Sequence, residues 1–518
     1  ACAAILGDTD TLQLMVDTFE QMLGPDSWVF YEDGTFYEGT YAYQGQFIGG
    51  IWPVPEIVRD NLDVDIYSNP KCALWEKVLT WYLDSIFPDG TMPAIADAHV
   101  GYRPLADWSE IAHTRYGNRK ALRHLRDVCG DLLTPGGEFA VFYRDPDAAA
   151  VQDSGEPYGL ESTRLTGMGL MILRDGASPQ PRTMAFLDYG PLLPRNHKQR
   201  DYGNFGLWAC GFEMVSEIGY AHQPVWVNRW QGAPIAHNTV LEVASQEQKG
   251  EPMLWCINAR CRMAEAGLPG SNSRFIAMLL RPEGLPLIVD IFRVSGPAEA
   301  STWALHARSS DWTVTGIDDL QPAQVEEPLR NASRGTAGGD ISATWTFATQ
   351  NHAVLRAMML ATTPAEVTLS ECPPEEDEVL KAHVSGGNPR PGVEMPYRGH
   401  IQIKRPNPAV FVTVYAPGDD AHPNDLVAEL VPVEGRPDAV GVDLRCADGT
   451  RFVLLHAPEP GPVTCRGLTV NGRAGAVCLI DRAARWLSLA GGGTASYEAI
   501  SVIASDGSNA FMELTPEG

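Results

Sequence analysis

Residues 195–205, RNHKQRDYGNF, concentrate side chains that can carry protons or positive charge. The segment contains Arg195, Asn196 and His197, and a second imidazole, His237, follows 40 residues after the first within the apolar, β-branched stretch AHNTV. Imidazole is well suited to acid–base catalysis near neutral pH, and cations bind anionic substrates. The segment is therefore either a solvated loop or the floor of a catalytic cleft for an anionic substrate.

His197, Gln199 and Asp201 occupy alternate positions, which would share one face of a β-strand. Glu217 and His237 follow at intervals of 20 residues, as adjacent strands of a sheet would deliver them. Side chains of these types meeting across strands can hold a metal ion, although Gln is a poor ligand for zinc. The alternative is a hydrogen-bonded structural role for each histidine.

The overall composition limits the class of partner. The chain has 518 residues, enough for two to four domains, and its 39 Lys and Arg against 65 Asp and Glu give a net charge of −26. Such a charge repels polyanions at long range and argues against nucleic acid, whereas a local basic cleft can still bind an acidic sugar. No apolar run is long enough for a membrane-spanning helix, so we expect no membrane insertion. The oligomeric state stays open.

Apolar residues recur at helical spacing in the first third of the chain, over residues 9–24, 71–87 and 106–130. Two long loops with residues capable of chemistry, 31–47 and 88–104, lie between them. Helices with such loops at one end fit a helical toroid or bundle that carries a cleft there.

In the rest of the chain the period of the pattern changes to two, which predicts antiparallel sheets. The expected fold is a multidomain α+β chain with a helical (α/α) part over 1–178, a β-sandwich domain over 179–450 and a small β-domain over 451–518. Residues 238–245, NTVLEVAS, read as a strand, and the acidic, Pro/Gly-rich segment 371–398 reads as an exposed excursion.

Three stretches of the sequence resemble a known family. HKQRDYGNFGLWACGFEMVSEIGY (197–220), NRWQGAPIAHNTVLEV (228–243) and DGTFYEGTYAYQ (33–44) look like signature elements of the heparinase II/III-like polysaccharide lyases, which include several alginate lyases. The resemblance implies an incomplete (α/α) toroid followed by antiparallel β-sandwich sheets, with a cleft between them. It also implies β-elimination on a uronic-acid-containing polysaccharide.

The resemblance assigns roles to individual residues. Tyr43 takes the position of the family's catalytic Tyr, with Tyr41 as the near alternative, and His197 takes that of the second catalytic group. Glu38 and Tyr41 are otherwise expected to contact substrate. The resemblance also implies one structural divalent metal held by Gln199, Glu217 and His237. Gln199 stands where the family has a second His, which predicts a weaker zinc-type site or a hydrogen-bond network in its place.

A second departure concerns the substrate carboxylate. The Asn or Asn-His pair that neutralises it in the family has no counterpart in the short stretch before residue 33. Either an N-terminal segment is missing from this chain, or Arg195, Asn196, His99 or Arg229 performs that role. Trp230 is either a sugar-stacking platform or a core side chain.

The predicted function is a lyase that cleaves a 1,4-linked uronate polymer, of the glycosaminoglycan or alginate type. Such a site must neutralise the carboxylate, remove the C5 proton and protonate the leaving oxygen. The substrate class implies a secreted or periplasmic protein. One rival is a glycoside hydrolase that uses Asp33, Glu38 and Asp97. The other is a carbohydrate-binding protein without catalysis.

Overall fold

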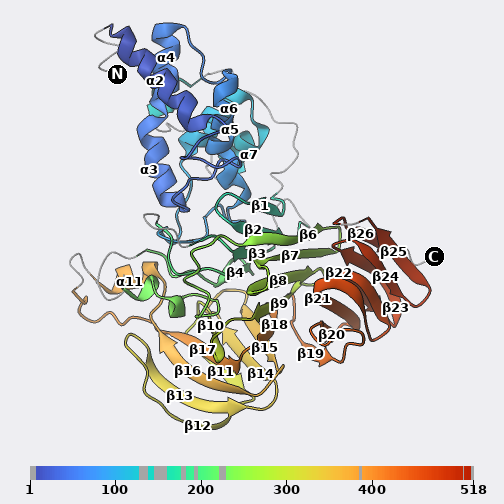
Figure 1. Cartoon of the computed structure of the whole chain (residues 1–518). Helices are drawn as coiled ribbons and strands as arrows, with labels where there is room; N and C mark the ends of the chain where they lie inside the picture. The colour runs from blue at the N-terminus through green and yellow to red at the C-terminus, as the bar shows by residue number, and fades with distance from the viewer. Residues whose placement is uncertain are drawn as a thin grey trace.

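Most of the helices lie at the N-terminal end of the molecule and rest on a stack of antiparallel sheets, while α11 (Glu376–Ala382) lies beside the sheets (Figure 1). None of the helices described has the length and apolar character that a membrane span requires. Arg195 and Asn196 lie outside the described residues. The computed structural model describes residues 7–127, 138–144, 160–176, 182–191, 197–220, 229–383, 388–505 and 507–514.

The N-terminal helices are short and amphipathic. In the first helix, the buried stripe that the spacing predicts consists of Leu12, Val16, Phe19 and Leu23. The N-cap of this helix is Asp8, whose carboxylate accepts a hydrogen bond from the backbone N–H of Thr11. The helices are α2 (Thr9–Leu23), α3 (Tyr41–Ile51), α4 (Pro53–Leu62), α5 (Leu74–Thr80), α6 (Ala106–Tyr116), α7 (Arg119–Asp127) and α8 (Glu138–Phe142).

The first sheet has both faces buried. Ile172 and Phe186 belong to a core shared with the helices, whereas their chain neighbours Leu173 and Leu187 belong to a core shared with the sheets below. Alternating side chains therefore join the helical part to the sandwich through this one sheet. Its strands, in spatial order, are β1 (Thr163–Leu165), β2 (Leu170–Arg174), β3 (Thr183–Asp188), β4 (Asn204–Ala209) and β5 (Phe212–Val215).

Two further sheets form the central sandwich. The larger runs in the order β11-β14-β15-β18-β9-β8-β7-β6 and the smaller in the order β10-β17-β16-β13-β12. Their strands are β6 (Glu251–Ile257), β7 (Cys261–Leu268), β8 (Asn272–Leu279), β9 (Leu287–Val294), β10 (Ala300–His306), β11 (Asp311–Thr315), β12 (Asp318–Pro322), β13 (Arg330–Ala337), β14 (Ile341–Thr346), β15 (Val354–Leu360), β16 (Ala365–Cys372), β17 (Arg398–Pro406) and β18 (Ala409–Gly418).

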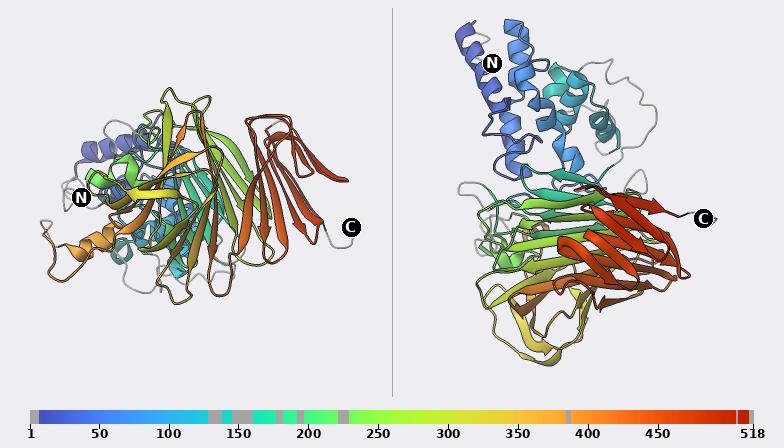
Figure 2. Two further views of the ribbon diagram at one scale, coloured as in Figure 1. Left: turned by 90° about the horizontal axis from the view of Figure 1, so that it is seen from below. Right: turned by 45° about the vertical axis from the view of Figure 1, so that its right-hand side comes forward.

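The last sheet packs face to face against the larger central sheet, as the two views of Figure 2 show. Val442 and Leu454 from the last sheet share a core with Phe275 and Val289 from the central one. Its strands are β19 (Leu426–Val431), β20 (Val440–Cys446), β21 (Thr450–Cys465), β22 (Leu468–Ile480), β23 (Ala483–Ala490), β24 (Gly493–Tyr497), β25 (Ile500–Ala504) and β26 (Ala510–Glu513).

The structure corrects several expectations about segments. The stretch predicted to be helical, 1–178, contains β1 and β2, and the last sheet begins at β19, before residue 451. Residues 238–245 form turns with a single bridge at Val240 instead of a strand. The predicted excursion 371–398 contains the helix α11 (Glu376–Ala382), which is anchored by buried carboxylates, so it is docked and not simply exposed.

Candidate active site

Tyr43 and His197 meet where the helical part rests on the first sheet. Tyr43 lies in the first turn of α3, which begins inside the predicted loop 31–47. The two rings stack with centroids 3.4 Å apart and an interplanar angle of 13°. His197 is 31% exposed and Tyr43 is partly buried, so solvent reaches the pair. Two residues distant in sequence, one a phenol and one an imidazole, therefore share one small surface.

Two carboxylates flank the imidazole of His197. Its Nδ1 lies 3.1 Å from Asp97 Oδ2, and its Nε2 lies 3.8 Å from Glu38 Oε2. Asp97 Oδ1 accepts a hydrogen bond from Gln199 Nε2 at 3.2 Å, and Glu38 accepts one from the Tyr37 hydroxyl at 2.9 Å. Residues 197–203 form no strand, so the predicted shared face of His197, Gln199 and Asp201 is wrong; His197 and Gln199 both contact Asp97, whereas Asp201 lies near Lys198.

Tyr220, His99 and the insertion that carries α11 form a further wall of the site around Tyr43 and His197. Burial, together with the nearby Asp97 carboxylate and Tyr43, raises the pKa of Tyr220 to about 12. His99 Nδ1 lies 2.7 Å from Glu376 Oε1, and this hydrogen bond raises the pKa of His99 despite its partial burial. His99 therefore stays cationic to a higher pH than an isolated imidazole.

The insertion is held against this wall by backbone contacts. Glu376 Oε2 accepts hydrogen bonds from the backbone N–H of Val100 at 3.1 Å and of Tyr220 at 3.4 Å. Gly219 has φ +85°, and a Cβ there would lie 2.7 Å from Val100. Only glycine permits this approach of the sheet to the helical part.

Lys198 points away from the cleft. Its ammonium is buried, pairs with Asp188 and lies 3.7 Å from Asp201. Its stem passes between Gly39 and Gly190, where an added Cβ would come within 3.1 Å and 3.0 Å of it. Lys198 thus pins the turn before α3 to the first sheet, and it does not add a cation to the cleft as the sequence cluster indicated.

Glu217 and His237 pair beneath the cleft, although neither lies on a strand as the sequence predicts. His237 Nδ1 lies 3.1 Å from Glu217 Oε2, while Asn204 donates to the other oxygen of Glu217. Burial alone would lower the pKa of His237, but Glu217 outweighs it and the pKa is raised. Both side chains are at most 1% exposed, so they support the site from behind.

The three predicted metal ligands each form at least one side-chain hydrogen bond. Gln199 turns its amide nitrogen to Asp97, and Glu217 uses its two oxygens for Asn204 and His237. Within the described ranges, no group of three or more His, Cys, Asp or Glu side chains is arranged to hold a metal ion. Gln199 Oε1 and His237 Nε2 are buried without a hydrogen-bond partner among the described residues, so hydrogen bonds do not occupy these two atoms and the metal site stays a prediction.

Tyr41 and Trp230 are both largely buried. Tyr41 is 1% exposed and stacks on Trp81 with centroids 5.0 Å apart. Trp230 is 2% exposed and packs in an apolar cluster with Ile218 and Leu329. The enclosed Tyr41 ring cannot reach a sugar, whereas Trp230 also lines a cavity, so both predicted roles of Trp230, sugar-stacking platform and core side chain, stay open.

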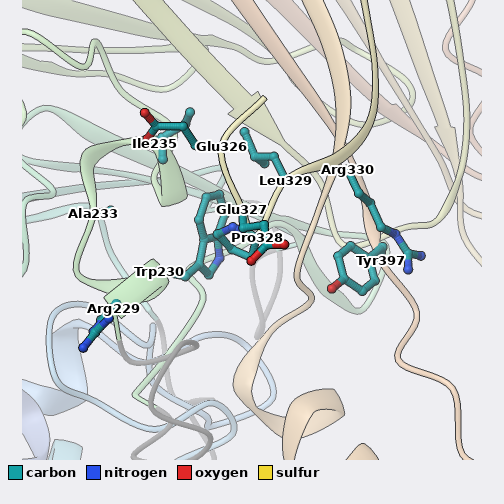
Figure 3. Close-up of a pocket in the computed structure, with 10 residues that line it drawn as sticks. All are labelled: Arg229, Trp230, Ala233, Ile235, Glu326, Glu327, Pro328, Leu329, Arg330 and Tyr397. Carbon is teal, nitrogen blue, oxygen red and sulfur yellow. The ribbon is translucent and has the colours of Figure 1, made fainter. Parts of the chain in front are cut away.

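A cavity of about 720 Å³ lies beside this site (Figure 3). Arg229 is exposed at its rim, and Figure 3 shows this side chain directed away from the Arg330–Tyr397 side. On that side the Arg330 guanidinium lies 3.4 Å from the centroid of the Tyr397 ring. Trp230 lines the cavity and also packs on Ile218, two residues before Tyr220. The cavity thus adjoins the wall that carries Tyr220.

Sequence reasoning missed three members of this site. Tyr220 ends the stretch 197–220 that resembles the family, so a signal existed. Asp97 was considered only as a hydrolase carboxylate, and its contact with His197 spans 100 positions of sequence. Glu376 comes from an insertion 277 positions away from its partner His99, and no local pattern indicates this pairing.

The fold matches solved polysaccharide lyase structures. A mutant of the heparan sulfate lyase HepC from Pedobacter heparinus gives a TM-score of 0.56 at 12% identity, over 84% of this chain and 60% of that chain. The heparinase III BT4657 gene product gives 0.54 at 13%, over 91% and 61%, and another heparinase III gives 0.54 at 11%, over 84% and 61%. No protein-family model and no curated protein matches the sequence.

This chain spans about three fifths of the length of these structures, and identities of 11–13% carry the fold alone. The fold agrees with the resemblance in the sequence elements around Tyr43, His197 and His237. The chain therefore has the heparinase III-like fold of polysaccharide lyases.

Proposed function

We propose that this protein is a polysaccharide lyase that cleaves a 1,4-linked uronate polymer by β-elimination. The observation that carries the proposal is the stacked pair of Tyr43 and His197, a phenol and an imidazole 3.4 Å apart at a solvent-reached junction. Both groups transfer protons, and elimination needs one proton removed and one delivered on neighbouring atoms of a single sugar.

The reaction uses the two groups in sequence. His197 Nε2 removes the C5 proton, the C5–H electrons form the C4–C5 double bond, and the C4–O bond breaks. Tyr43 delivers its phenolic proton to the departing oxygen. The proton held by His197 then returns to the phenolate through solvent, which restores both groups without an added oxidant or reductant.

The substrate carboxylate must be neutralised for the C5 proton to become acidic. We assign this role to His99, because its hydrogen bond to Glu376 raises the pKa of His99 and so favours its protonated form, and its side chain is 46% exposed. Arg229 at the rim of the cavity would bind a further anionic residue of the polymer. The carboxylates Glu38 and Asp97 would repel a uronate placed on their side of His197, so the sugar acid group faces His99.

The proposal includes the finer features that the resemblance implies. The helices over residues 9–142 would form part of an incomplete (α/α) toroid above the cleft. The polymeric substrate places the protein in the periplasm or outside the cell. Gln199, Glu217 and His237 act as a hydrogen-bonded support in this proposal, and elemental analysis of the purified protein tests the alternative of a bound divalent metal.

The test is to mix the purified protein separately with alginate, heparin, chondroitin and hyaluronan and to follow near-ultraviolet absorbance and reducing ends together. A lyase produces both signals, because the new double bond is conjugated with the carboxylate. Reducing ends without absorbance would identify a glycoside hydrolase that uses the carboxylates Glu38 and Asp97. Binding without either signal would identify a carbohydrate-binding protein and would refute the proposal.

A further inference from the structure

Asp97 contacts the segment of His197 in three ways. Its backbone N–H donates to the His197 carbonyl at 3.0 Å, its Oδ2 lies 3.1 Å from His197 Nδ1, and its Oδ1 accepts from Gln199 Nε2 at 3.2 Å. The preceding residue, Ala96, has φ +59°, a left-handed conformation that is costly for a residue with a Cβ. The helical part thus holds this carboxylate against the sheet part in one fixed arrangement.

The contact decides which ring nitrogen of His197 carries the proton. An ionised carboxylate only accepts hydrogen bonds, so Nδ1 must be the donor to Asp97. In a neutral imidazole the other nitrogen, Nε2, then carries the lone pair. Nε2 is the nitrogen that lies away from Asp97, on the side where Glu38 stands at 3.8 Å.

We infer that Asp97 is a positioning residue for the proposed elimination: it fixes the Nδ1–H tautomer of His197 and thereby presents Nε2 as the base. The inference rests on the proposed function for its catalytic consequence, but the tautomer itself does not depend on any activity. It also assigns a role to Gln199, which occupies the second oxygen of Asp97 and holds the carboxylate plane toward the imidazole.

The same contacts argue against Asp97 as a group that touches the sugar. Both of its oxygens accept hydrogen bonds from side chains of the protein, and its side chain is only 17% exposed. A hydrolytic carboxylate needs one oxygen directed at the glycosidic bond or at a water.

The test measures the ¹⁵N chemical shifts of the His197 ring in the full chain at a pH where the ring is neutral, together with kcat and KM on the best polymer. The wild-type protein is expected to show a protonated Nδ1 and an unprotonated Nε2. Asp97→Asn is expected to shift the population toward the other tautomer and to lower kcat by about a hundredfold, with KM changed less than about threefold. Loss of an orienting carboxylate from a histidine costs up to about 10⁴-fold in kcat, and the stacking of His197 on Tyr43 retains part of the orientation here.

Asp89→Asn is the matched control, because Asp89 belongs to the same loop but accepts its hydrogen bonds from Thr91. It should leave the tautomer and kcat unchanged. Asp97→Glu keeps an acceptor for Nδ1 and should preserve the tautomer while recovering part of kcat.

Two results would overturn the inference: an Nε2–H tautomer in the wild-type protein, or an Asp97→Asn variant that folds and keeps both the tautomer and kcat. If Asp97→Asn does not fold, the wild-type spectrum and Asp97→Glu still decide. If the wild-type protein shows no lyase activity, the proposed function fails, and the ¹⁵N spectra alone then decide whether Asp97 sets the tautomer.

Discussion

Replacing Tyr43 by Phe removes one oxygen from the proposed site and little else. The ring that stacks on His197 stays, because phenylalanine fills the same space at the same 3.4 Å separation. The change removes at most one neutral contact of the hydroxyl near Tyr220, which would be worth about 0.5–1.5 kcal/mol. We therefore expect a folded protein whose free energy of unfolding falls by no more than about that amount.

The effect on catalysis is expected to be much larger. A positioned acid or base contributes about 10²–10⁴-fold to a rate. At 1.36 kcal/mol per decade this corresponds to about 2.7–5.4 kcal/mol in the activation barrier. The loss should appear in kcat and not in KM, since the missing proton is needed only as the C4–O bond breaks.

Initial rates of absorbance increase with wild-type and Tyr43→Phe protein measure this loss directly, and thermal unfolding of both checks the fold. Tyr116→Phe provides the matched control, because the same oxygen is removed from a tyrosine of α6 that packs on Tyr67. A Tyr43→Phe protein that keeps more than a tenth of the wild-type rate would refute the assignment of Tyr43 as the acid.

Three further variants probe the surroundings of the pair. His99→Gln should raise KM about tenfold with kcat little changed, because a charged contact with the substrate is lost. The KM of the wild-type protein should also rise as the pH increases through the raised pKa of His99. A KM that does not depend on pH would contradict the role of the pairing between His99 and Glu376. Lys198→Met should lower the free energy of unfolding by about 3–5 kcal/mol in a denaturant titration, since Asp188 would remain buried without its cation, whereas a change below about 1 kcal/mol would show that the ion pair is dispensable. Glu217→Ala should lower the melting temperature because it removes the acceptor of two buried donors, and wild-type melting together with the absence of bound metal would remove its supporting role.

The spacing of apolar residues predicted those helices and strands whose buried side chains recur at regular intervals. The stripe of α2 and the all-buried strand β3 follow from spacing alone, because one face or two faces of each element must be covered. The stretch AHNTV has the composition of a strand but forms turns. The side chains of Asn238 and Thr239 donate hydrogen bonds to the carbonyl oxygens of Ser216 and Tyr202, respectively. Tertiary hydrogen bonds outweighed β-propensity there.

The site was predictable where its residues lie in one segment and unpredictable where the fold brings them together. Glu217 and His237 do contact each other, but neither lies on the adjacent strands that their 20-residue spacing predicted. The cluster at 197–201 did not reveal that Lys198 turns inward to a buried carboxylate, because residue type does not show which side chain faces the core. Glu376 could not be predicted either, because its insertion reaches the site only through the packing of the sheets.

The most direct measurement is a crystal structure of the Tyr43→Phe protein with a uronate oligosaccharide bound. The account predicts a sugar ring whose C5 lies within about 3.5 Å of His197 Nε2, the distance of a near-attack arrangement, with its carboxylate against His99. An oligosaccharide that lies in the Arg229 cavity alone, or that turns its C5 away from both His197 and residue 43, would contradict the proposed elimination.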